Sequence, residues 1–418
     1  PSIGQTSAVK EVLAVLDSQE ALPMLWRASL SDDANERQQF IAAAEHCHAH
    51  NVRFPNSLDE VQMLQSLGDS AFARYLLGCF WYSKRRYDEA VSCWRETLEK
   101  SPDYAPAHRL LGVYSWNKQQ DATQALAYLQ RAVALEPDNA RFLFELDFLQ
   151  KLLARPVHER LTTLVERKAV VLKRDDLTAE LLSLWNASGH YADAAAILDT
   201  RVFHPWEGGE GKITGQYLLN QLHRALQFIE RGAFKQATDC LKAALRYPDN
   251  LGEGRLPGQT DNDIWYLLGY CAEQAGDAQQ AAEYYQLARQ GGSTLDAGRY
   301  YNDQPADYLF WQGIALRKSG NPAQAEQHFR HFIDWAAQHR DDVPQVDFFA
   351  VSLPDLVVLD VSAQQRHLQH CLFIEALGHL GLGNVSACQQ RMQQLLQINP
   401  AHDKAHLIRH ALQSGIFS

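Results

Sequence analysis

Apolar side chains recur at helical spacing along the stretch from Asp263 to Gln290, with polar positions between them. A short turn sequence, Ala-Gly-Asp at residues 275–277, divides this stretch into two halves. The apolar positions are Trp265, Leu268 and Ala272 in the first half, and Ala281, Tyr285 and Ala288 in the second. A period near 3.6 residues on each side of a turn predicts two short amphipathic helices that pack as a pair.

Small and large residues alternate where the two predicted helices would cross. Gly269 and Ala281 are small enough to let two helix backbones approach, and Trp265 and Tyr285 supply bulk beside them. This arrangement resembles the tetratricopeptide repeat, a helix pair of ~34 residues that cannot bury its apolar face alone. The resemblance implies that several such pairs stack side by side.

Similar pairs recur along much of the chain. Clear repeats are predicted from Ala71 to Pro137 and from Tyr217 to Pro400, and the repeat that ends at Pro137 has one extra residue in its inter-helix turn. Between these spans lie a degenerate pair broken by Pro156, since proline ends a helix, and a further unit that begins at Leu177. The small residues expected at close helix crossings are Gly78, Gly112, Gly269 and Gly313.

These patterns predict an all-α chain with an α-α superhelix fold, that is, a tetratricopeptide-like solenoid with long ordered loops. We expect a helix at residues 402–412 to cap the open end of the array, because terminal repeats need a polar outer face. The predicted segments are an irregular helical lead-in at 1–70, repeats at 71–200, a Gly-rich loop at 201–216, repeats with inserted loops at 217–400, and a capping helix at 401–418.

Composition and charge narrow the class of partner. The chain has 418 residues, 46% of them hydrophobic, but no apolar run near the ~18 residues that a membrane helix needs. A net charge of −11 without clustered Lys and Arg argues against nucleic-acid binding. Seven cysteines without paired spacing indicate reduced thiols, as in a cytoplasmic protein. We recognise no signal peptide. The chain begins with Pro1 rather than Met, as a fragment of a longer protein would.

A histidine-rich stretch at residues 45–50 raises the question of a metal site. His46 and His50 are four residues apart and so share a helix face. Two ligands without a third partner are a weak metal signal, and imidazoles near a helix end can instead meet its last carbonyls. We therefore expect an ordinary helix end, with no metal ion and no cofactor.

Three connections are much longer than helix pairs require. They lie at 201–212, 248–257 and 346–355. Long ordered loops are usually either functional or packed to fill a gap. In a superhelix, connections on one edge of successive repeats lie side by side, so we expect the three loops to meet in one groove.

The loop sequences carry a more specific resemblance. The segments FHPWEGGEGKITGQY, YPDNLGEGRLPG, YYNDQPAD and DFFAVSLPDLVV, followed by HC and LGHLGLG, occur in this order. They resemble a family of large bacterial proteins that join an N-terminal mutarotase-like β-sandwich to a C-terminal tetratricopeptide region. The resemblance begins near Phe54 and implies that this chain is the repeat half without the β-sandwich. The turn LDVS at 359–362 departs from the more acidic turn of the family, and the family lends no activity to these residues.

The first loop concentrates groups that could bind a ligand. Glycines let a backbone approach closely, Trp206 has a face that could stack on a sugar, and two carboxylates could accept hydroxyl hydrogen bonds or act as an acid/base pair. The alternative is a structural plug, in which Trp206 is buried and the carboxylates cap helix amides; catalysis ranks third. The candidate residues are His204, Trp206, Glu207, Glu210 and Lys212 of the loop and Tyr217 of the helix that follows.

The other two loops offer fewer candidates. Asn250, Glu253 and Arg255 could line the same groove, although a plain turn with Arg255 in a surface ion pair also explains them. Asp347 and Asp355 could serve the site too, but the apolar residues between them alternate as a buried strip would, which favours packing.

The sequence predicts a non-catalytic scaffold that binds a protein, a peptide or a small ligand on the concave face of the repeats. Ion pairs from Lys212 and Arg255 to Glu207, Glu210 or Asp355 would hold the loops together. The alternative is an accessory half of a carbohydrate-active protein, which docks on or completes a mutarotase-like β-sandwich; it depends on the family resemblance alone. A hydrolase that uses two of these carboxylates ranks lowest. The expected partners are a protein, a peptide or a carbohydrate, and neither nucleic acid nor a membrane.

Overall fold

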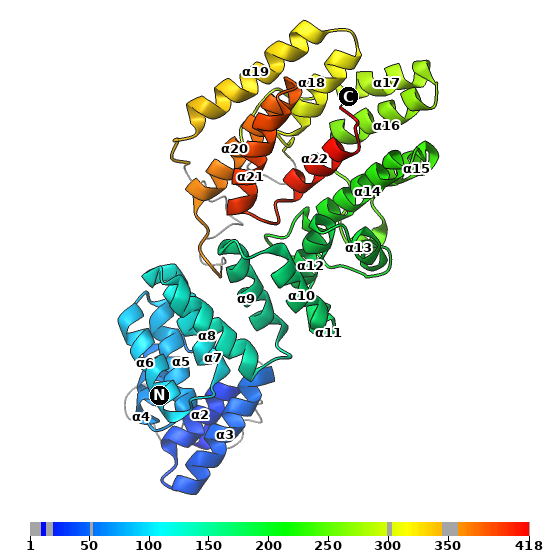
Figure 1. The fold of residues 1–418 in the computed structure, drawn as a ribbon. Coiled ribbons are helices and arrows are strands. Elements are labelled where there is room, and N and C mark those ends of the chain that lie inside the picture. Colours follow the sequence, from blue (N-terminus) through cyan, green and yellow to red (C-terminus); the bar gives the residue numbers. More distant parts are fainter. Residues whose placement is uncertain (1–9, 14–19, 51–52, 299–302, 345–357, 418) are drawn as a thin grey trace. The chain divides into compact units, whose positions relative to one another are not determined.

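The computed structural model describes residues 10–13, 20–50, 53–298, 303–344 and 358–417. Every regular element in these ranges is a helix, and consecutive helices pair as in an α-α superhelix, so the predicted fold class is confirmed (Figure 1). The chain divides into two compact units, Pro1–Phe142 and Leu143–Ser418, and α9 (Ala140–Leu152) carries the chain from the first unit to the second.

The first unit contains the helical lead-in and two repeats. One core joins them, in which Phe72, Trp94 and Leu111 are almost fully buried. The lead-in helices are α2 (Ala21–Leu30), α3 (Ala34–His50) and α4 (Leu58–Ser66), and the repeats are α5 (Ala71–Ser83) with α6 (Tyr87–Lys100) and α7 (Ala105–Tyr114) with α8 (Ala122–Leu135).

The second unit begins with the degenerate pair, in which α10 (Val157–Glu166) and α11 (Lys168–Val171) follow α9. α14 starts at Lys212, so the last five residues of the loop predicted at 201–216 are helical. The pairs that follow are α12 (Asp175–Ala187) with α13 (Tyr191–Leu198), α14 (Lys212–Glu230) with α15 (Phe234–Ala244), α16 (Asn262–Gln274) with α17 (Ala278–Ala288), α18 (Tyr308–Lys318) with α19 (Pro322–His339), and α20 (Ala363–Gly381) with α21 (Val385–Ile398); η2 (Asp249–Leu251) precedes α16, and α22 (Asp403–Gln413) comes last.

The predicted close crossings are confirmed at all four glycines. A Cβ on Gly269 would lie 2.6 Å from the ring of Tyr285, and one on Gly313 would lie 2.6 Å from the ring of Phe329. In the first unit, Gly112 meets Leu129 in the same way, at 2.9 Å, and a Cβ on Gly78 would collide with the indole of Trp94. Each of these four pairs therefore closes where the first helix has no side chain and the second has a large one.

The extra residue in the second repeat forms a π-helical turn. η1 (Ser115–Gln119) continues α7, and Gln120 then adopts a left-handed conformation with a φ of 56°. The backbone N–H of Asp121 donates to Ser115 O at 2.9 Å, and the Asp121 side chain accepts from Gln124 N at 2.9 Å, which caps α8. One inserted residue is thus absorbed within a single turn.

A buried charge network holds the degenerate pair. Arg160 and Asp147 are each 2% exposed, and the guanidinium donates to both carboxylate oxygens of Asp147, at 2.9 and 2.7 Å. Glu180 accepts from Arg160 at 3.0 Å and from Lys151 at 2.8 Å. Burial acts to raise the pKa of Glu180, but these two cations outweigh it and lower the pKa to about 2. The network connects α9, α10 and α12 across the break that proline makes.

The last helix does not cap the end of the array, so this prediction is wrong. α22 turns back and lies along the inner face that the first helices of the pairs form (Figure 1). Nearly all sides of α22 are buried, whereas a cap keeps one side polar and exposed. Its almost fully buried apolar residues are Ala405, Leu407, Ile408 and Ala411.

Two further properties of the described residues concern the state of their cysteines and the length of their helices. All seven cysteines are free, and five of them are buried. Burial raises the pKa of Cys271 and of Cys388 to about 12, so both remain protonated. No helix in the described ranges is both long enough and apolar enough to cross a bilayer.

Histidines recur every fourth residue from the start of α22. Each of them, with His223 of α14, has a pKa below its usual value, and burial is the main cause; the pKa of His402 falls to about 4. Glu230 faces His410 and acts against this shift. The contacts that use a ring nitrogen lone pair are His402 Nδ1 with Ala405 N at 3.2 Å, His406 Nδ1 with Arg409 Nη2 at 2.8 Å, and His410 Nδ1 with His223 Nδ1 at 2.9 Å.

We expect Gly269→Leu to destabilise the protein by about 1–3 kcal/mol, because the new side chain overpacks the crossing with Tyr285. The unfolding midpoint in urea measures this loss. Gly215→Ala is the control, since no atom lies within 4 Å of the added methyl group and alanine favours the helix by up to about 1 kcal/mol. Equal midpoints for Gly269→Leu and the wild type would contradict the assigned crossing.

We expect acid to destabilise the second unit, because its buried imidazoles gain protons more readily in the unfolded chain. A histidine with a folded pKa below the unfolded value of about 6.5 stabilises fully above that pH and loses its contribution as the pH falls toward the folded pKa. For His402 the loss between pH 7.5 and pH 5 is on the order of 2 kcal/mol. Urea-unfolding curves at the two pH values measure it.

The matched variant for this experiment is His402→Asn. Asparagine keeps a side-chain acceptor for the first turn of α22 but has no titratable group. Its unfolding free energy should therefore change less between the two pH values. The same pH dependence in the variant and the wild type would show that His402 is not responsible.

Candidate functional site

The first two predicted loops contact each other directly. Phe203 N–H donates to Asn250 O at 2.8 Å, and the side-chain amide of Asn250 donates to the carbonyls of Leu198 and Arg201, both at 2.8 Å. Phe203 itself is almost fully buried. A Cβ on Gly252 would lie 2.6 Å from the carbonyl oxygen of Phe203, so the two backbones are in close contact. Asn250 therefore braces the two loops through its side-chain amide nitrogen and its backbone oxygen.

The start of the first loop is anchored to α12. Arg201 pairs with Asp175 at 2.6 Å and also donates to Leu172 O at 2.8 Å. The second oxygen of Asp175 accepts from the backbone N–H of His204 at 2.9 Å. The imidazole of His204 is 80% exposed and lies 3.4 Å from the same carboxylate. The backbone of His204 is thus fixed while its ring lies at the surface.

Trp206 packs onto its own loop. Its indole covers Gly209, where any Cβ would collide with the ring. The ammonium of Lys212 lies 6.0 Å from the ring centroid, at the limit of a cation–π contact. The indole is half-buried. Trp206 is therefore neither the fully buried plug nor a freely exposed stacking surface.

The carboxylates of this region bind backbone groups. Glu253, from the second loop, accepts from Gly211 N–H through both oxygens, each at 3.1 Å. Gly211 directly precedes α14, so Glu253 places negative charge at the positive end of that helix. Glu210 accepts from Gly208 N–H at 3.3 Å, and both Glu207 and Glu210 are exposed.

Two other candidates contact the protein interior. Tyr217 is buried, and its hydroxyl donates to Ala243 O at 3.1 Å, so it belongs to the core of its helix pair. Arg255 pairs with Asp261 and donates to Gln259 O at 3.3 Å. Arg255 thus forms an ion pair within its own loop, as the alternative interpretation of this loop predicted, and its predicted pairing with a glutamate of the first loop is wrong.

The third predicted loop lies outside the described residues. Asp347 and Asp355 therefore remain predictions, and so does the meeting of all three loops. The side chain of His50 is also outside the described set, while His46 is exposed on α3. Within the part of the chain that the structure describes, no group of three or more His, Cys, Asp or Glu could hold a metal ion.

Beside the two loops lies a pocket of about 470 Å³, which we call the loop pocket. It is formed by the start of α14, the loop before α16, the start of α16, the segment before α18, and one side chain of α22. Three of the sequence motifs that carry the family resemblance contribute to its walls. Its polar lining residues include Thr214, Tyr247, Glu253, Gln259, Thr260, Asp263, Asp303, Gln304, Tyr308 and Lys404.

Lys404 of α22 is the cation of the loop pocket. Its ammonium lies 3.2 Å from Asp307, 3.7 Å from Asp263 and 5.4 Å from the ring centroid of Tyr308. Burial acts to lower the pKa of Lys404, but the two carboxylates outweigh it and raise the pKa. Burial raises the pKa of Asp263, which is 2% exposed, although Lys404 acts in the opposite direction.

The remaining polar groups of the loop pocket suit binding rather than covalent chemistry. The hydroxyl of Thr260 is buried and has no hydrogen-bond partner among the described residues. A bound molecule could supply that partner, as buried polar groups require. Lys404 stays protonated at neutral pH because its pKa is raised, and a protonated amine is not a nucleophile.

The sequence analysis missed most residues of the loop pocket. Among the predicted candidates that the structure describes, only Glu253 lines it. Asp263 begins the stretch that showed the repeat pattern, and Tyr308 follows the YYNDQPAD motif, so a signal existed for both. No sequence signal pointed to Lys404, because it reaches this site only through the return of α22 to the inner face.

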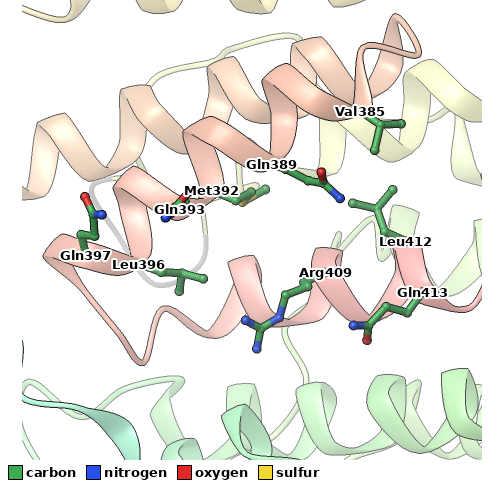
Figure 2. A pocket seen from close by; sticks show the side chains of 9 residues that line it. All are labelled: Val385, Gln389, Met392, Gln393, Leu396, Gln397, Arg409, Leu412 and Gln413. Carbon is green, nitrogen blue, oxygen red and sulfur yellow. The ribbon is translucent and has the colours of Figure 1, made fainter.

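A second concavity separates α21 from α22, and we call it the α21–α22 groove (Figure 2). Its volume is about 570 Å³. Side chains of the two helices face each other across it, with apolar residues between amides. The lining residues are Val385, Met392, Leu396 and Leu412, then Gln389, Gln393, Gln397 and Gln413, and finally Arg409.

Comparison with known proteins agrees with this architecture. A family profile described as tetratricopeptide repeat matches residues 81–140 and 222–298, which lie in the helices α5–α9 and α14–α17 and the connections after them. A similar solved structure is the "Crystal structure of PilW, widely conserved type IV pilus biogenesis factor", with 16% sequence identity and a TM-score of 0.28 over 52% of this chain and 90% of that chain. The profile match shows tetratricopeptide repeats in these two spans, and such repeats suggest a protein-interaction scaffold.

We expect Lys404→Met to destabilise the protein by about 2–3 kcal/mol, because it leaves Asp263 buried without its cation. Thermal or urea unfolding measures the change. Adding Asp263→Asn should restore part of the loss, since the uncompensated charge is then removed.

The control is Arg330→Met, which breaks the exposed pair between Arg330 and Glu326 on α19. Such i,i+4 pairs contribute about 0.3–0.5 kcal/mol. Similar losses for Lys404→Met and Arg330→Met would show that the ion pair in the loop pocket has no special importance.

Proposed function

We propose that this chain is a non-catalytic tetratricopeptide scaffold and that a polar peptide segment of a protein partner enters the loop pocket. The observation that carries the proposal is the convergence of three separate sequence segments, together with Lys404, on one pocket. Loops are where binding residues concentrate when a rigid scaffold positions them.

The geometry favours a peptide because the loop pocket combines aromatic and hydrogen-bonding groups. Tyr247 and Tyr308 supply ring faces, and Thr260 supplies a hydroxyl that needs a partner. Pockets with a few convergent polar groups among apolar walls are typical binding sites for ligands of this size. Glu253 already accepts a hydrogen bond from the backbone just before α14. Its role is therefore to form the wall of the loop pocket rather than to contact the peptide.

The absence of a catalytic role is part of the proposal. Glu207 and Glu210 are exposed on their loop, and Lys404 is held by two carboxylates. A carbohydrate is the alternative occupant, as an accessory role beside a mutarotase-like β-sandwich would require. Tyrosine rings and hydroxyl groups suit a sugar as well, so the same experiment must include sugars.

The test is selection from a displayed peptide library, with the loop pocket blocked in some variants. Gly215 and Gly254 both line the pocket, and a Cβ on either meets no atom within 4 Å. Gly215→Trp or Gly254→Trp should therefore fill the pocket without disturbing the packing. We expect the wild type to enrich one peptide pattern and both variants to lose it, with at least about a tenfold weaker Kd for the synthetic peptide.

The control is Ala282→Trp, which adds the same side chain to the exposed face of α17. It should enrich the same peptides as the wild type. Enrichment that survives in both blocked variants would place the peptide elsewhere and reject the loop pocket. Binding of a sugar panel instead of peptides, again lost in both variants, would favour the carbohydrate alternative. Hydrolysis of aryl glycosides that disappears in Glu207→Gln or Glu210→Gln would reject the non-catalytic assignment.

A further inference from the structure

α22 contacts the second unit much as a bound helix contacts a groove. It lies along the inner face of the unit beside first helices such as α12 and α14, and on another side it faces α21 (Figure 1). Solenoids of helical repeats commonly bind their partners on this face. Here the chain fills it with its own helix.

The beginning of α22 is fixed by polar contacts with three first helices and with the residue that precedes a fourth, α18. The two oxygens of Asp403 accept from Ser183 Oγ of α12 and from Gln216 Nε2 of α14, both at 2.7 Å. The next residue, Lys404, reaches Asp263 of α16 and Asp307 at the start of α18. An acidic residue followed by a lysine is therefore the pattern that this end of the groove recognises.

The far end of α22 is fixed by aromatic contacts. Phe417 lies 5.4 Å from the ring of Phe310 and 5.8 Å from that of Trp311, both on α18. Tyr266 of α16 donates from its hydroxyl to Ile416 O at 3.2 Å. The aromatic anchor follows Lys404 by 13 residues, a distance that one helix and a short turn span.

α22 is separated from the helix that precedes it in the chain. Only residues 399–402 connect α21 to α22, and the α21–α22 groove opens between the two helices (Figure 2). The contacts that fix α22 are thus made mainly with helices far away in the sequence. A separate helix with the same groups could make all of these contacts without the connection.

We propose that the inner face of the second unit is a helix-binding groove, that α22 is its occupant within the chain, and that an amphipathic helix of a partner protein replaces α22 there. The partner helix carries an Asp-Lys pair at its start and an aromatic residue 13 positions after the lysine. This surface shares Asp263 with the wall of the loop pocket, and the loop pocket also contains Lys404 of α22. The inference does not require that a peptide enters the loop pocket.

The connection to α21 sets the affinity that a partner needs. A short linker holds α22 at an effective concentration in the millimolar range, so the helix within the chain outcompetes an equal helix in solution. A partner therefore binds only with better contacts or when α22 is weakened. This competition makes the inference testable with the chain's own sequence as the probe.

The experiment measures the binding of a fluorescent synthetic peptide, residues 399–418, to the full chain by anisotropy. Phe417→Ala in the chain weakens α22 but leaves the groove intact. We expect the wild-type peptide to bind this variant about tenfold or more tightly than it binds the wild-type chain. A peptide that itself carries Phe417→Ala should lose that gain. Hydrogen exchange at residues 403–413 of the chain should rise when the peptide binds, because α22 is displaced.

The control variant is Gln413→Ala, which alters an exposed residue of α22 that lines the α21–α22 groove. It should bind the peptide no better than the wild type. If Phe417→Ala does not fold, Lys404→Met with its matched peptide replaces it. Loss of the fold in both variants would show that α22 is an integral part of the core and would overturn the proposal. Equal binding to wild type and variant, or binding without increased exchange in α22, would overturn it as well.

Discussion

The contact between a glycine on one helix and a large side chain on its partner determines how four of the helix pairs close. Gly78 meets Trp94, Gly269 meets Tyr285 and Gly313 meets Phe329, and in each case a methyl group on the glycine would collide with the ring. Because these contacts fix the distance and crossing of the two helices, they also fix which face each pair offers to the next. In the second unit, this constraint sets the crossing of α16 with α17 and of α18 with α19, and so the part of the inner face that α16 and α18 form.

The inner face of the second unit is filled rather than open. α22 brings both apolar residues and charges to it, and the charges find partners on helices that precede it by more than a hundred residues, as in the pair of Lys404 with Asp263. Buried charges are tolerated only when they are paired. The ion pairs therefore select one position of α22 on this face, and the apolar residues supply most of the stabilisation. Burial lowers the pKa of the histidines along the same helix, so we expect this docking to weaken in acid.

The loops show how structural and binding roles divide within one segment. Asn250 and Glu253 hold neighbouring loop backbones and the start of α14, and Arg201 ties the first loop to Asp175. These side chains already have hydrogen-bond or ion-pair partners within the protein. The groups left to meet a ligand, such as the hydroxyl of Thr260, come from segments that the braces bring together. A rigid pocket built this way loses little entropy when a partner binds.

The sequence by itself determined the helix pairs, the glycines at their crossings and the break at Pro156, because these depend on local periodicity and on the size of nearby side chains. It also predicted that the first two loops would meet, since both leave the same edge of adjacent repeats. Only the tertiary structure decided that Arg255 pairs with Asp261, that Tyr217 is a core residue, and that Lys404 belongs to the loop pocket. It likewise decided that α22 turns inward instead of capping the array. Arg255 and Asp261 are only six residues apart, but the other outcomes depend on contacts between residues farther apart in the chain. A local pattern carries no information about which distant groups will satisfy a buried charge or hydroxyl.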